Sequence, residues 1–305
     1  MSSGYFLGVD VGSASVRAGV FDASGKRLAF ATRPISQFRP GPDRVEQSSA
    51  EIWQQVCDAV KGAVSSSGIC IEDIRSLGFD ATCSLVALDE QGQGLAVSPG
   101  EPSDHNIIMW MDHRAVQEAQ HINATQDPAL RYVGGEVSVE MELPKVLWLK
   151  KHFPATWHSA HRFYDLADYL VCKATGSDVA GLCTLTCKWN YLAHEQRFSH
   201  SLLDAVELTD LTGKIPSHIL PPGAAVGTLS ADAAQALGLT TAVVVASGMI
   251  DAHAGGLALA GVEPTGTVLV CHAAWLLVDG GRAKRRWGIG RLDAPGIRCE
   301  CRAIS

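Results

Sequence analysis

A short segment near the amino terminus, residues 5–22, constrains the fold more than any other part of the 305-residue chain. An apolar run ends there at Asp10, small residues follow from Gly12 to Ser15, and alternation of apolar and polar residues resumes at Val16. This pattern predicts two strands joined by a tight turn. Glycine lets a backbone approach an anion closely, and the N–H groups and hydroxyls of a turn can cradle phosphate oxygens. An ordinary hairpin, with these residues acting only as turn formers, is the alternative.

The carboxylate of Asp10 adds a second feature to this turn. It would repel phosphate unless a divalent cation lay between the two groups, so Asp10 is a candidate Mg²⁺-associated residue that acts through water. The segment D-x-G-S-x-S-x-R, formed by Asp10, Gly12, Ser13, Ser15 and Arg17, resembles the first phosphate motif of the actin-like ATPase superfamily, which contains actin, the heat-shock chaperone ATPases, hexokinase and the FGGY carbohydrate kinases. This resemblance implies that these five residues bind the cofactor ATP, with Mg²⁺ at Asp10.

The composition is that of a soluble globular protein. A length of 305 residues and an apolar content of 47% suffice for one large domain, or for one domain and part of a second. The net charge of -7 gives no general attraction to nucleic acid or to an anionic membrane. No apolar run is long enough to cross a membrane, and the first residues do not form a signal peptide. The nine cysteines are irregularly spaced, which indicates free thiols in a reducing compartment rather than disulfides or a zinc site. We therefore expect a cytoplasmic protein.

The order of the predicted elements favours a mixed α/β fold. After the first two strands come a strand at 27–32, an amphipathic helix with apolar residues every four positions over 52–64, and a strand at 74–79. Ser48 and Glu51 form a capping box before this helix. The order of three strands, a helix and a strand is similar to the ribonuclease-H-like unit of actin-like ATPases, so we expect that fold.

Two later segments resemble the sugar-binding segments of FGGY carbohydrate kinases. Trp110, Asp112 and Arg114 match a W-x-D-x-R pattern in an expected strand at 107–114, although an ion pair closing that strand would also explain Arg114. Lys188 matches a lysine that contacts the ketose in the ribulokinase branch, and a solvated lysine is the alternative. Sugar recognition requires donors and acceptors that leave no hydroxyl unpaired. The resemblance implies that the sugar is bound by Asp80, Thr82, Asp112, Arg114, Lys188 and Asp251.

A further family pattern is matched only in part. In residues 140–152, Lys145 and Trp148 fit the first FGGY pattern, whereas Glu142 stands where the family has a small residue or proline. The apolar residues of the same segment also predict a helix that packs on the core.

Asp251 is the strongest single candidate for catalysis. A run of β-branched residues at 241–246 predicts a buried strand that leads to G-M-I-D-A-H. In FGGY kinases the aspartate of a G-x-x-D-A segment is the general base that accepts the proton of the sugar hydroxyl as it attacks the γ-phosphorus of ATP, and Asp251 matches it. A helix N-cap role is compatible with catalysis. Just upstream, Ser230 and Gly238 predict the start and end of a short helix.

The resemblance to the family ends near residue 270. We expect a sugar-binding FGGY N-terminal domain of the ribonuclease-H-like type at 1–260, an incomplete start of the family's second domain at 261–279, and a divergent basic tail without regular structure at 280–305. No G-T-S turn follows the strand expected at 266–270. Since phosphoryl transfer depends on positioning and charge stabilisation, we expect this chain to be catalytically weak or inactive unless the missing half is supplied.

The resemblance implies a carbohydrate kinase that transfers the γ-phosphate of MgATP to a hydroxyl of a pentulose or pentitol. D-Ribulose is the first choice because D-A-T-C-S, C-K-W-N-Y and I-D-A-H-A-G-G are similar to the ribulokinase-like branch. A non-catalytic sugar-binding or regulatory protein is one alternative, and an ATPase of the actin or heat-shock chaperone type is another. The expected partner is a small sugar or polyol, not nucleic acid or a membrane, and the oligomeric state is left open, a homodimer included.

Overall fold

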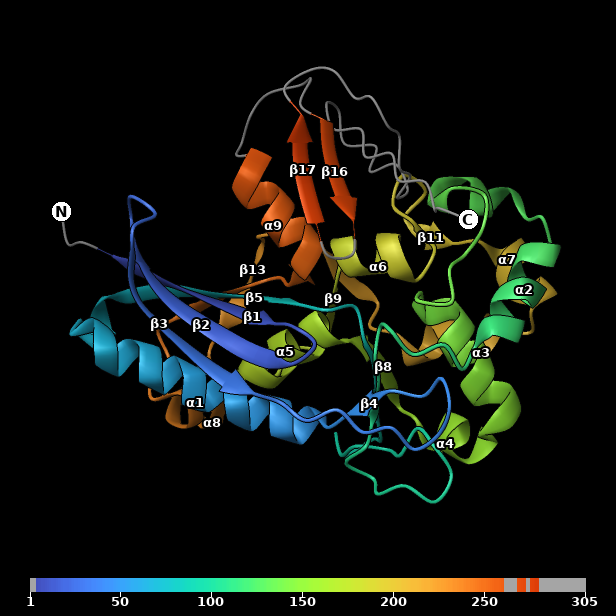
Figure 1. Ribbon diagram of the computed structural model, residues 1–305, viewed down its shortest axis with the longest axis horizontal. Helices are drawn as coiled ribbons and strands as arrows, with labels where there is room; N and C mark the ends of the chain where they lie inside the picture. Colours follow the sequence, from blue (N-terminus) through green and yellow to red (C-terminus); the bar gives the residue numbers. More distant parts are fainter. Residues whose placement is uncertain (1–3, 261–267, 273–274, 280–305) are drawn as a thin grey trace.

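The computed structural model describes residues 4–260, 268–272 and 275–279, and a large mixed sheet dominates its amino-terminal part (Figure 1). The strands of this sheet are β1 (Tyr5–Val11), β2 (Ser15–Asp22), β3 (Arg27–Pro34), β5 (Ile74–Ala81), β13 (Ala225–Thr228), β14 (Val244–Ala246) and β15 (Met249–Ile250). They lie in the order β13–β14–β5–β1–β2–β3, and β15 pairs with β5 beyond the end of β14. β2 is antiparallel to β1, whereas β1, β14 and β15 all run parallel to β5. The two strands and the turn predicted for residues 5–22 are therefore confirmed.

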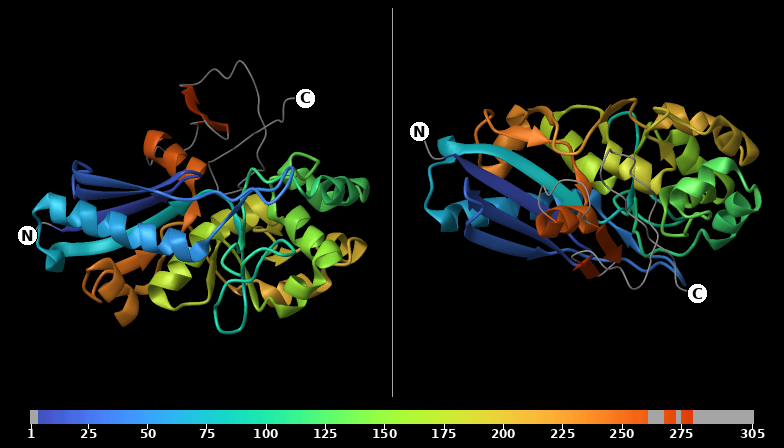
Figure 2. Two further views of the ribbon diagram at one scale, coloured as in Figure 1. Left: turned by 60° about the horizontal axis from the view of Figure 1, so that its bottom comes forward. Right: turned by 90° about the horizontal axis from the view of Figure 1, so that it is seen from above.

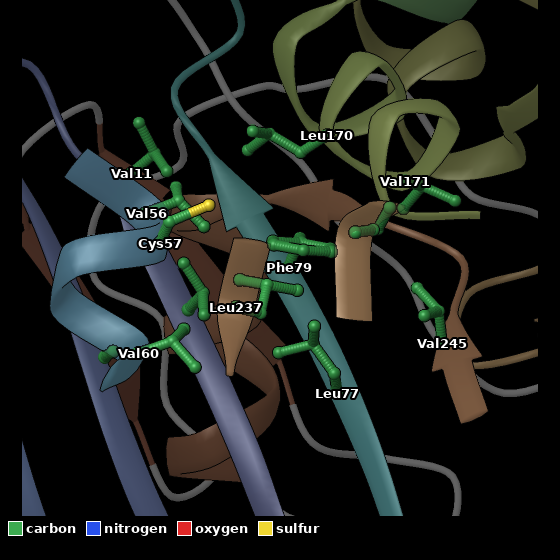
Figure 3. Close-up of a cluster of buried hydrophobic side chains, with 14 of the residues drawn as sticks. Val11, Val56, Cys57, Val60, Leu77, Phe79, Leu170, Val171, Leu237 and Val245 are labelled. Atoms are coloured by element: carbon green, nitrogen blue, oxygen red, sulfur yellow. The ribbon is translucent and has the colours of Figure 1, made fainter. Parts of the chain in front are cut away.

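One face of this sheet is covered by three helices, α1 (Ser49–Ser67), α5 (Leu166–Thr175) and α8 (Ala231–Leu237). Figure 3 shows Val56 and Val60 of α1 and Leu170 of α5 packed around Leu77 and Phe79 of β5. Burying each such side chain contributes about 1.5–3 kcal/mol. The helix α9 (Asp251–Ala260) lies on the opposite side of the sheet from α1 (Figures 1 and 2).

The amino-terminal end of α1 is capped as expected, but only on one side of the predicted box. Ser48 Oγ accepts the backbone N–H of Glu51 at 3.2 Å. The carboxylate of Glu51 does not return to Ser48; its Oε1 accepts the backbone N–H and the hydroxyl of Ser36 at 3.0 and 2.8 Å. The reciprocal half of the capping box is therefore wrong, because Ser36 in the loop after β3 binds the carboxylate of Glu51 instead. Ser230 and Gly238 cap α8 as predicted.

A smaller sheet stands between two hydrophobic cores. Its strands, in the order β4–β7–β6–β8, are β4 (Glu46–Gln47), β7 (Ile107–Ile108), β6 (Leu85–Leu88) and β8 (Arg162–Asp165). Successive residues of β6 point to opposite faces, so Val86 and Leu88 join the core beneath the large sheet while Leu85 and Ala87 join the second core. The second core lies among the helices on the right of Figure 1, which include α2 (Val116–Ala124), α3 (Glu142–His152) and α4 (Pro154–Ser159).

The remaining elements complete the fold. The helices are α2 (Val116–Ala124), α3 (Glu142–His152), α4 (Pro154–Ser159), α6 (Leu182–Lys188) and α7 (His200–Ala205), with the short 3-10 helices η1 (Ile71–Asp73), η2 (Pro128–Val133) and η3 (Thr209–Lys214). One small parallel pair is formed by β9 (Val179–Gly181) with β12 (His218–Leu220). Two small antiparallel pairs are formed by β10 (Tyr191–Leu192) with β11 (Arg197–Phe198) and by β16 (Val268–His272) with β17 (Trp275–Asp279).

Two expected strands are shorter than the apolar runs that predicted them. Of residues 107–114 only Ile107–Ile108 pair with neighbouring strands, and the backbone N–H of Asp112 then closes a turn on the carbonyl of Met109 at 3.1 Å. Of residues 241–246 only Val244–Ala246 form a strand. Ile107, Ile108 and Met109 are fully buried although the third lies outside the strand, so an apolar run does not distinguish burial from strand pairing. In the second segment Val243 and Val245 are buried but Val244 is 36% exposed, so the strand predicted to be buried is buried on one face only.

Part of the predicted domain division lies outside the described residues. Residues 261–267, 273–274 and the basic tail at 280–305 are among them, so the boundaries near 260 and 279 remain predictions. Across the part that is described, no helix is both long and apolar enough to span a membrane.

Candidate active site

Three aspartates come together at one edge of the large sheet. Asp10 of β1 is the register partner of Asp80 of the parallel strand β5. On the other side of β5, Met249 of β15 pairs with Asp80, and Asp251 follows β15 as the first residue of α9. Since neighbouring strands lie about 4.8 Å apart, the three carboxylates share one region. The sequence indicated each residue separately, and the sheet brings them together.

Burial raises the pKa values of all three carboxyl groups. For Asp80, burial and then the charges of Asp10 and Asp251 raise the pKa to about 8. Burial also raises the pKa of Asp10, with Arg17 opposing and Asp251 adding to the effect. Burial raises the pKa of Asp251 as well, although the backbone N–H of Ala252, 2.7 Å from its Oδ1, opposes the shift. At neutral pH Asp80 therefore holds a proton, and the cluster carries less than its full negative charge.

The turn after β1 closes as the sequence predicts. The backbone N–H of Gly12 donates to the carbonyl of Ser15 at 3.0 Å, and Arg17 of β2 is the cross-strand partner of Asp10. Arg17 Nη1 lies 3.3 Å from Asp10 Oδ2. A Cβ atom on Gly12 would lie 2.7 Å from Arg17 Nη2, so glycine leaves room for this guanidinium.

Asp10 also offers a free acceptor. Its Oδ1 is buried and accepts no hydrogen bond from any residue that the structure describes. No group of three or more histidine, cysteine, aspartate or glutamate side chains in the described ranges is arranged to enclose a metal ion. The arrangement therefore fits an ion whose bound water donates to Asp10, and not an ion held in a cage of side chains.

Ser13 of the same turn is joined to the predicted sugar segment. The indole Nε1–H of Trp110 donates to Ser13 Oγ at 2.8 Å, while the backbone N–H of Trp110 donates to Ser84 Oγ at 3.2 Å. The carbonyl of Ser13 accepts the side-chain amides of Gln37 and Gln47 at 2.9 and 3.1 Å. The sequence placed Ser13 and Trp110 in two separate motifs, and their direct contact was not predicted.

Thr82 lies just beyond the end of β5, two residues after Asp80. Its backbone N–H donates to the carbonyl of Val11 at 3.0 Å, and its Oγ1 lies 3.4 Å from Ser84 Oγ. Ser84 therefore lies between the buried Thr82 and the backbone N–H of Trp110.

Asp112 and Arg114 form a buried ion network and are not exposed at the surface of the site. The side chains of Arg114 and Asp112 are 2% and 0% exposed. Arg114 Nε and Nη2 donate to Asp112 Oδ1 and Oδ2 at 2.8 and 2.7 Å, and Nη2 also donates to Glu46 Oε1 at 2.7 Å. Nη1 donates to the carbonyl of Val97 and the hydroxyl of Ser98 at 2.8 and 3.1 Å. All five guanidinium hydrogens are engaged inside the protein, as in the ion-pair alternative, and direct sugar binding by these two residues remains a prediction.

Lys188, at the end of α6, is not a freely solvated charge. Its ammonium group hydrogen-bonds Cys83. Burial lowers the pKa of Lys188, but the charge and hydrogen bond of Cys83, followed by the charges of Glu140 and Glu142, hold that pKa above its ordinary value. Burial raises the pKa of Cys83 to about 11. Lys188 in turn opposes the rise in the pKa of Asp251, which shows that the two predicted sugar-site residues share one electrostatic environment.

Glu142 is a buried residue beside this site that the sequence did not assign. Its side chain and that of Lys145 are both 0% exposed, with Lys145 Nζ 3.4 Å from Glu142 Oε1. Burial raises the pKa of Glu142 to about 7, against the effects of Lys145 and Lys188. The departure of Glu142 from the family pattern was the one signal in the sequence that this position is unusual.

The chain is similar to known proteins over most of its length. The sequence profile of the FGGY family of carbohydrate kinases, N-terminal domain, matches residues 5–258. The FGGY carbohydrate kinase domain-containing protein of Homo sapiens is 46% identical over 96% of this chain and 55% of its own length. The D-ribulokinase of Saccharomyces cerevisiae is 40% identical over 87% of this chain and 39% of its own length. The chain thus spans about half the length of the curated relatives it matches, or less.

Solved structures agree on the fold. A xylulose kinase from Lactobacillus acidophilus superposes with a TM-score of 0.74 at 17% identity, over 87% of this chain and 52% of that one. A glycerol kinase from Plasmodium falciparum, solved with ADP, superposes with a TM-score of 0.71 at 13% identity, over 88% and 52% of the two chains. These similarities confirm the predicted actin-like, ribonuclease-H-like α/β fold. Taken with the profile match, they show that the chain belongs to the FGGY family of carbohydrate kinases.

Proposed function

We propose that this chain provides the sugar-binding and base-bearing part of an ATP-dependent kinase that phosphorylates a hydroxyl of a pentulose or pentitol, with D-ribulose as the first candidate. The observation that carries the proposal is the position of Asp251, directly after β15 and beside the strand end that bears Asp80. D-Ribulose is favoured because the yeast D-ribulokinase is 40% identical over 87% of the chain.

In this proposal Asp251 accepts the proton of the attacking sugar hydroxyl. Its raised pKa makes it a stronger base than an exposed aspartate, and the positive charge of Lys188 keeps it ionised for that role. Lys188, Thr82 and the protonated Asp80 supply donors for the other sugar hydroxyls. The free Oδ1 of Asp10 accepts a hydrogen bond from Mg²⁺-bound water.

The turn at residues 12–15 lies where phosphate oxygens would be held. The hydroxyls of Ser13 and Ser15 and backbone N–H groups after Gly12 are the donors, and Arg17 adds positive charge next to Asp10. MgATP, when bound, supplies the phosphoryl group and a cation that offsets its negative charge. The Trp110 contact to Ser13 keeps this turn next to the sugar segment.

Sugar binding without turnover is the second candidate. Every residue predicted to bind the sugar lies within residues 5–258, the range that the N-terminal-domain profile matches.

The experiment that tests the proposal is ADP release from MgATP by the purified chain, with and without D-ribulose, alongside calorimetric titration with the sugar. The variants are Asp251→Asn and, as a matched control, Asp104→Asn at an exposed aspartate in a loop. Sugar-dependent turnover that is lost only in Asp251→Asn supports the kinase. Saturable sugar binding without turnover favours the second candidate, and a folded chain that neither binds the sugar nor releases ADP overturns both.

A further inference from the structure

A cluster of sulfur and imidazole groups lies beside the candidate base. Cys183 of α6 and His253 of α9 come from segments 70 residues apart, and Cys183 Sγ lies 3.0 Å from His253 Nδ1. Cys187, one helical turn after Cys183, has its Sγ 3.9 Å from the same nitrogen. Both cysteines are buried, at 3% and 8% exposure, in a small apolar cluster with Ile250. None of these groups has a part in the proposed phosphoryl transfer.

We propose that Cys183 is a reactive thiolate site, which hydroperoxides oxidise to a sulfenic acid and which Cys187 then converts to an intramolecular disulfide. The geometry supports the first step because the sulfur of Cys183 receives several hydrogen bonds at once. His253 Nδ1 donates to it when that nitrogen carries the proton, and the thiol of Cys187 and the backbone N–H of Ile250 donate as well. A sulfur that accepts this many hydrogen bonds is stabilised as the anion, which is the nucleophilic form.

Cys57, Cys70 and Cys83 differ from Cys183 in their surroundings. The hydrogen bonds from Cys187 and His253 hold the pKa of Cys183 well below the usual range although burial opposes this. Burial raises the pKa values of Cys57 and Cys83 to about 11. Cys70 is exposed, but its thiol donates to Glu72 Oε2 at 2.7 Å, and this hydrogen bond raises its pKa. Cys70 is therefore exposed but held as a neutral thiol, whereas Cys183 is buried but stabilised as a thiolate.

The chemistry of the two steps is balanced. The Cys183 thiolate attacks one oxygen of the hydroperoxide, the O–O bond breaks, and sulfenic acid and hydroxide or alkoxide form. The thiol of Cys187 then attacks the Cys183 sulfur, and a disulfide and water result. The hydroperoxide is the oxidant, and the two thiols together lose two electrons.

The disulfide would change the local structure. Residues four apart on a helix have Cβ atoms about 5–6 Å apart, whereas a disulfide needs about 3.5–4.5 Å, so α6 must unwind in part. Lys188 directly follows Cys187 at the end of this helix. The same step removes the thiolate that faces His253, two residues after Asp251. Oxidation thus acts on two elements that carry predicted sugar-site residues.

The test treats the full-length wild-type chain with hydrogen peroxide at neutral pH and maps cysteine oxidation by differential alkylation and peptide mass spectrometry. The expected result is that Cys183 and Cys187 lose their thiols together, at least about tenfold faster than the exposed Cys70, and appear in one disulfide-linked peptide. In a Cys187→Ser variant, dimedone is expected to trap a sulfenic acid at Cys183.

Faster oxidation of Cys70 than of Cys183 would overturn the proposal, and so would a disulfide from Cys183 to Cys83. Persistence of both thiols after Cys70 has reacted would also overturn it. The wild-type comparison needs no substitution, so it remains decisive if Cys187→Ser does not fold. Because the readout is covalent, it does not depend on whether the chain transfers phosphate.

Discussion

Asp10 and Asp80 face each other across the parallel strands β1 and β5, as register partners at the edge where Asp251 also begins its helix. Burial of the two carboxyl groups, together with their mutual repulsion, makes the state in which both are ionised unfavourable. The pair therefore stores a proton near neutral pH, and this proton is the clearest electrostatic signature of the site.

The first prediction concerns the pH dependence of stability. The pKa of Asp80 is raised from 3.8 to about 8, so between these values the folded state binds a proton that the unfolded state has released. The free energy of unfolding should therefore fall as the pH rises from about 4 to about 8. Asp80→Asn removes this titration, and its stability relative to the wild type should grow between about pH 5 and pH 8 by on the order of 2 kcal/mol.

Urea unfolding at both pH values measures this effect. Asp104→Asn, at an exposed loop position, is the matched control and should follow the wild-type curve. Parallel pH profiles for the wild type and Asp80→Asn would show that the carboxylate cluster does not hold the proton. Since the charges of Asp10 and Asp251 contribute to the raised pKa of Asp80, the slope belongs to the cluster as a whole.

The second prediction concerns the contribution of the buried network around Arg114 to stability. Arg114→Lys keeps the charge but loses the fork that reaches Asp112, Glu46 and two further acceptors, and it should lower the free energy of unfolding by on the order of 3 kcal/mol. The control is Arg75→Lys, at a side chain that is 49% exposed and 3.9 Å from Asp73, where the change should stay within about 0.5 kcal/mol. Equal losses for the two variants, measured by urea unfolding, would contradict the network's importance.

Local signals in the sequence predicted much of this fold. The turn at residues 12–15, the capping of α1 by Ser48 and the limits of α8 depend on residues within a few positions of one another, and the structure confirms them. Family resemblance, not local pattern, pointed to Asp251 and Lys188, and their shared electrostatic environment came only from the sheet and helix packing.

Long-range pairing explains what the sequence missed. Arg114 and Glu46 are 68 positions apart, and the sequence around either residue does not indicate which residue it pairs with. The same is true of Cys183 and His253, and of Ser13 and Trp110. The strand predicted at 107–114 was too long for a related reason, since its apolar side chains pack in separate places: Ile107 in the core beneath the large sheet, Ile108 in the second core and Trp110 beside the small cluster that contains Cys183.

The contact between Ser13 and Trp110 gives a third prediction. In a double-mutant cycle of Ser13→Ala and Trp110→Phe, the coupling energy in the free energy of unfolding should be about 0.5–1.5 kcal/mol, because Trp110 Nε1 donates to Ser13 Oγ at 2.8 Å. Ser36→Ala combined with Trp110→Phe should be additive, since the hydroxyl of Ser36 instead donates to Glu51. A coupling near zero for the first pair would mean that the turn at residues 12–15 and the segment of Trp110 are energetically independent.

The last prediction uses two glycines on either side of Asp251. A Cβ atom on Gly248 would lie 3.0 Å from the Cβ and 3.1 Å from the carbonyl oxygen of Ala167, atoms that cannot rotate away, so Gly248→Ala must displace the chain that leads into Asp251. We expect it to cost about 1–3 kcal/mol of stability and to weaken D-ribulose binding. Gly255→Ala, in α9, meets no heavy atom within 4 Å and should stabilise the helix by about 0.5–1 kcal/mol without changing sugar affinity. Thermal unfolding and calorimetric titration of both variants check this, and a Gly248→Ala protein with unchanged stability would show that α5 and the segment that leads into Asp251 are not in close contact.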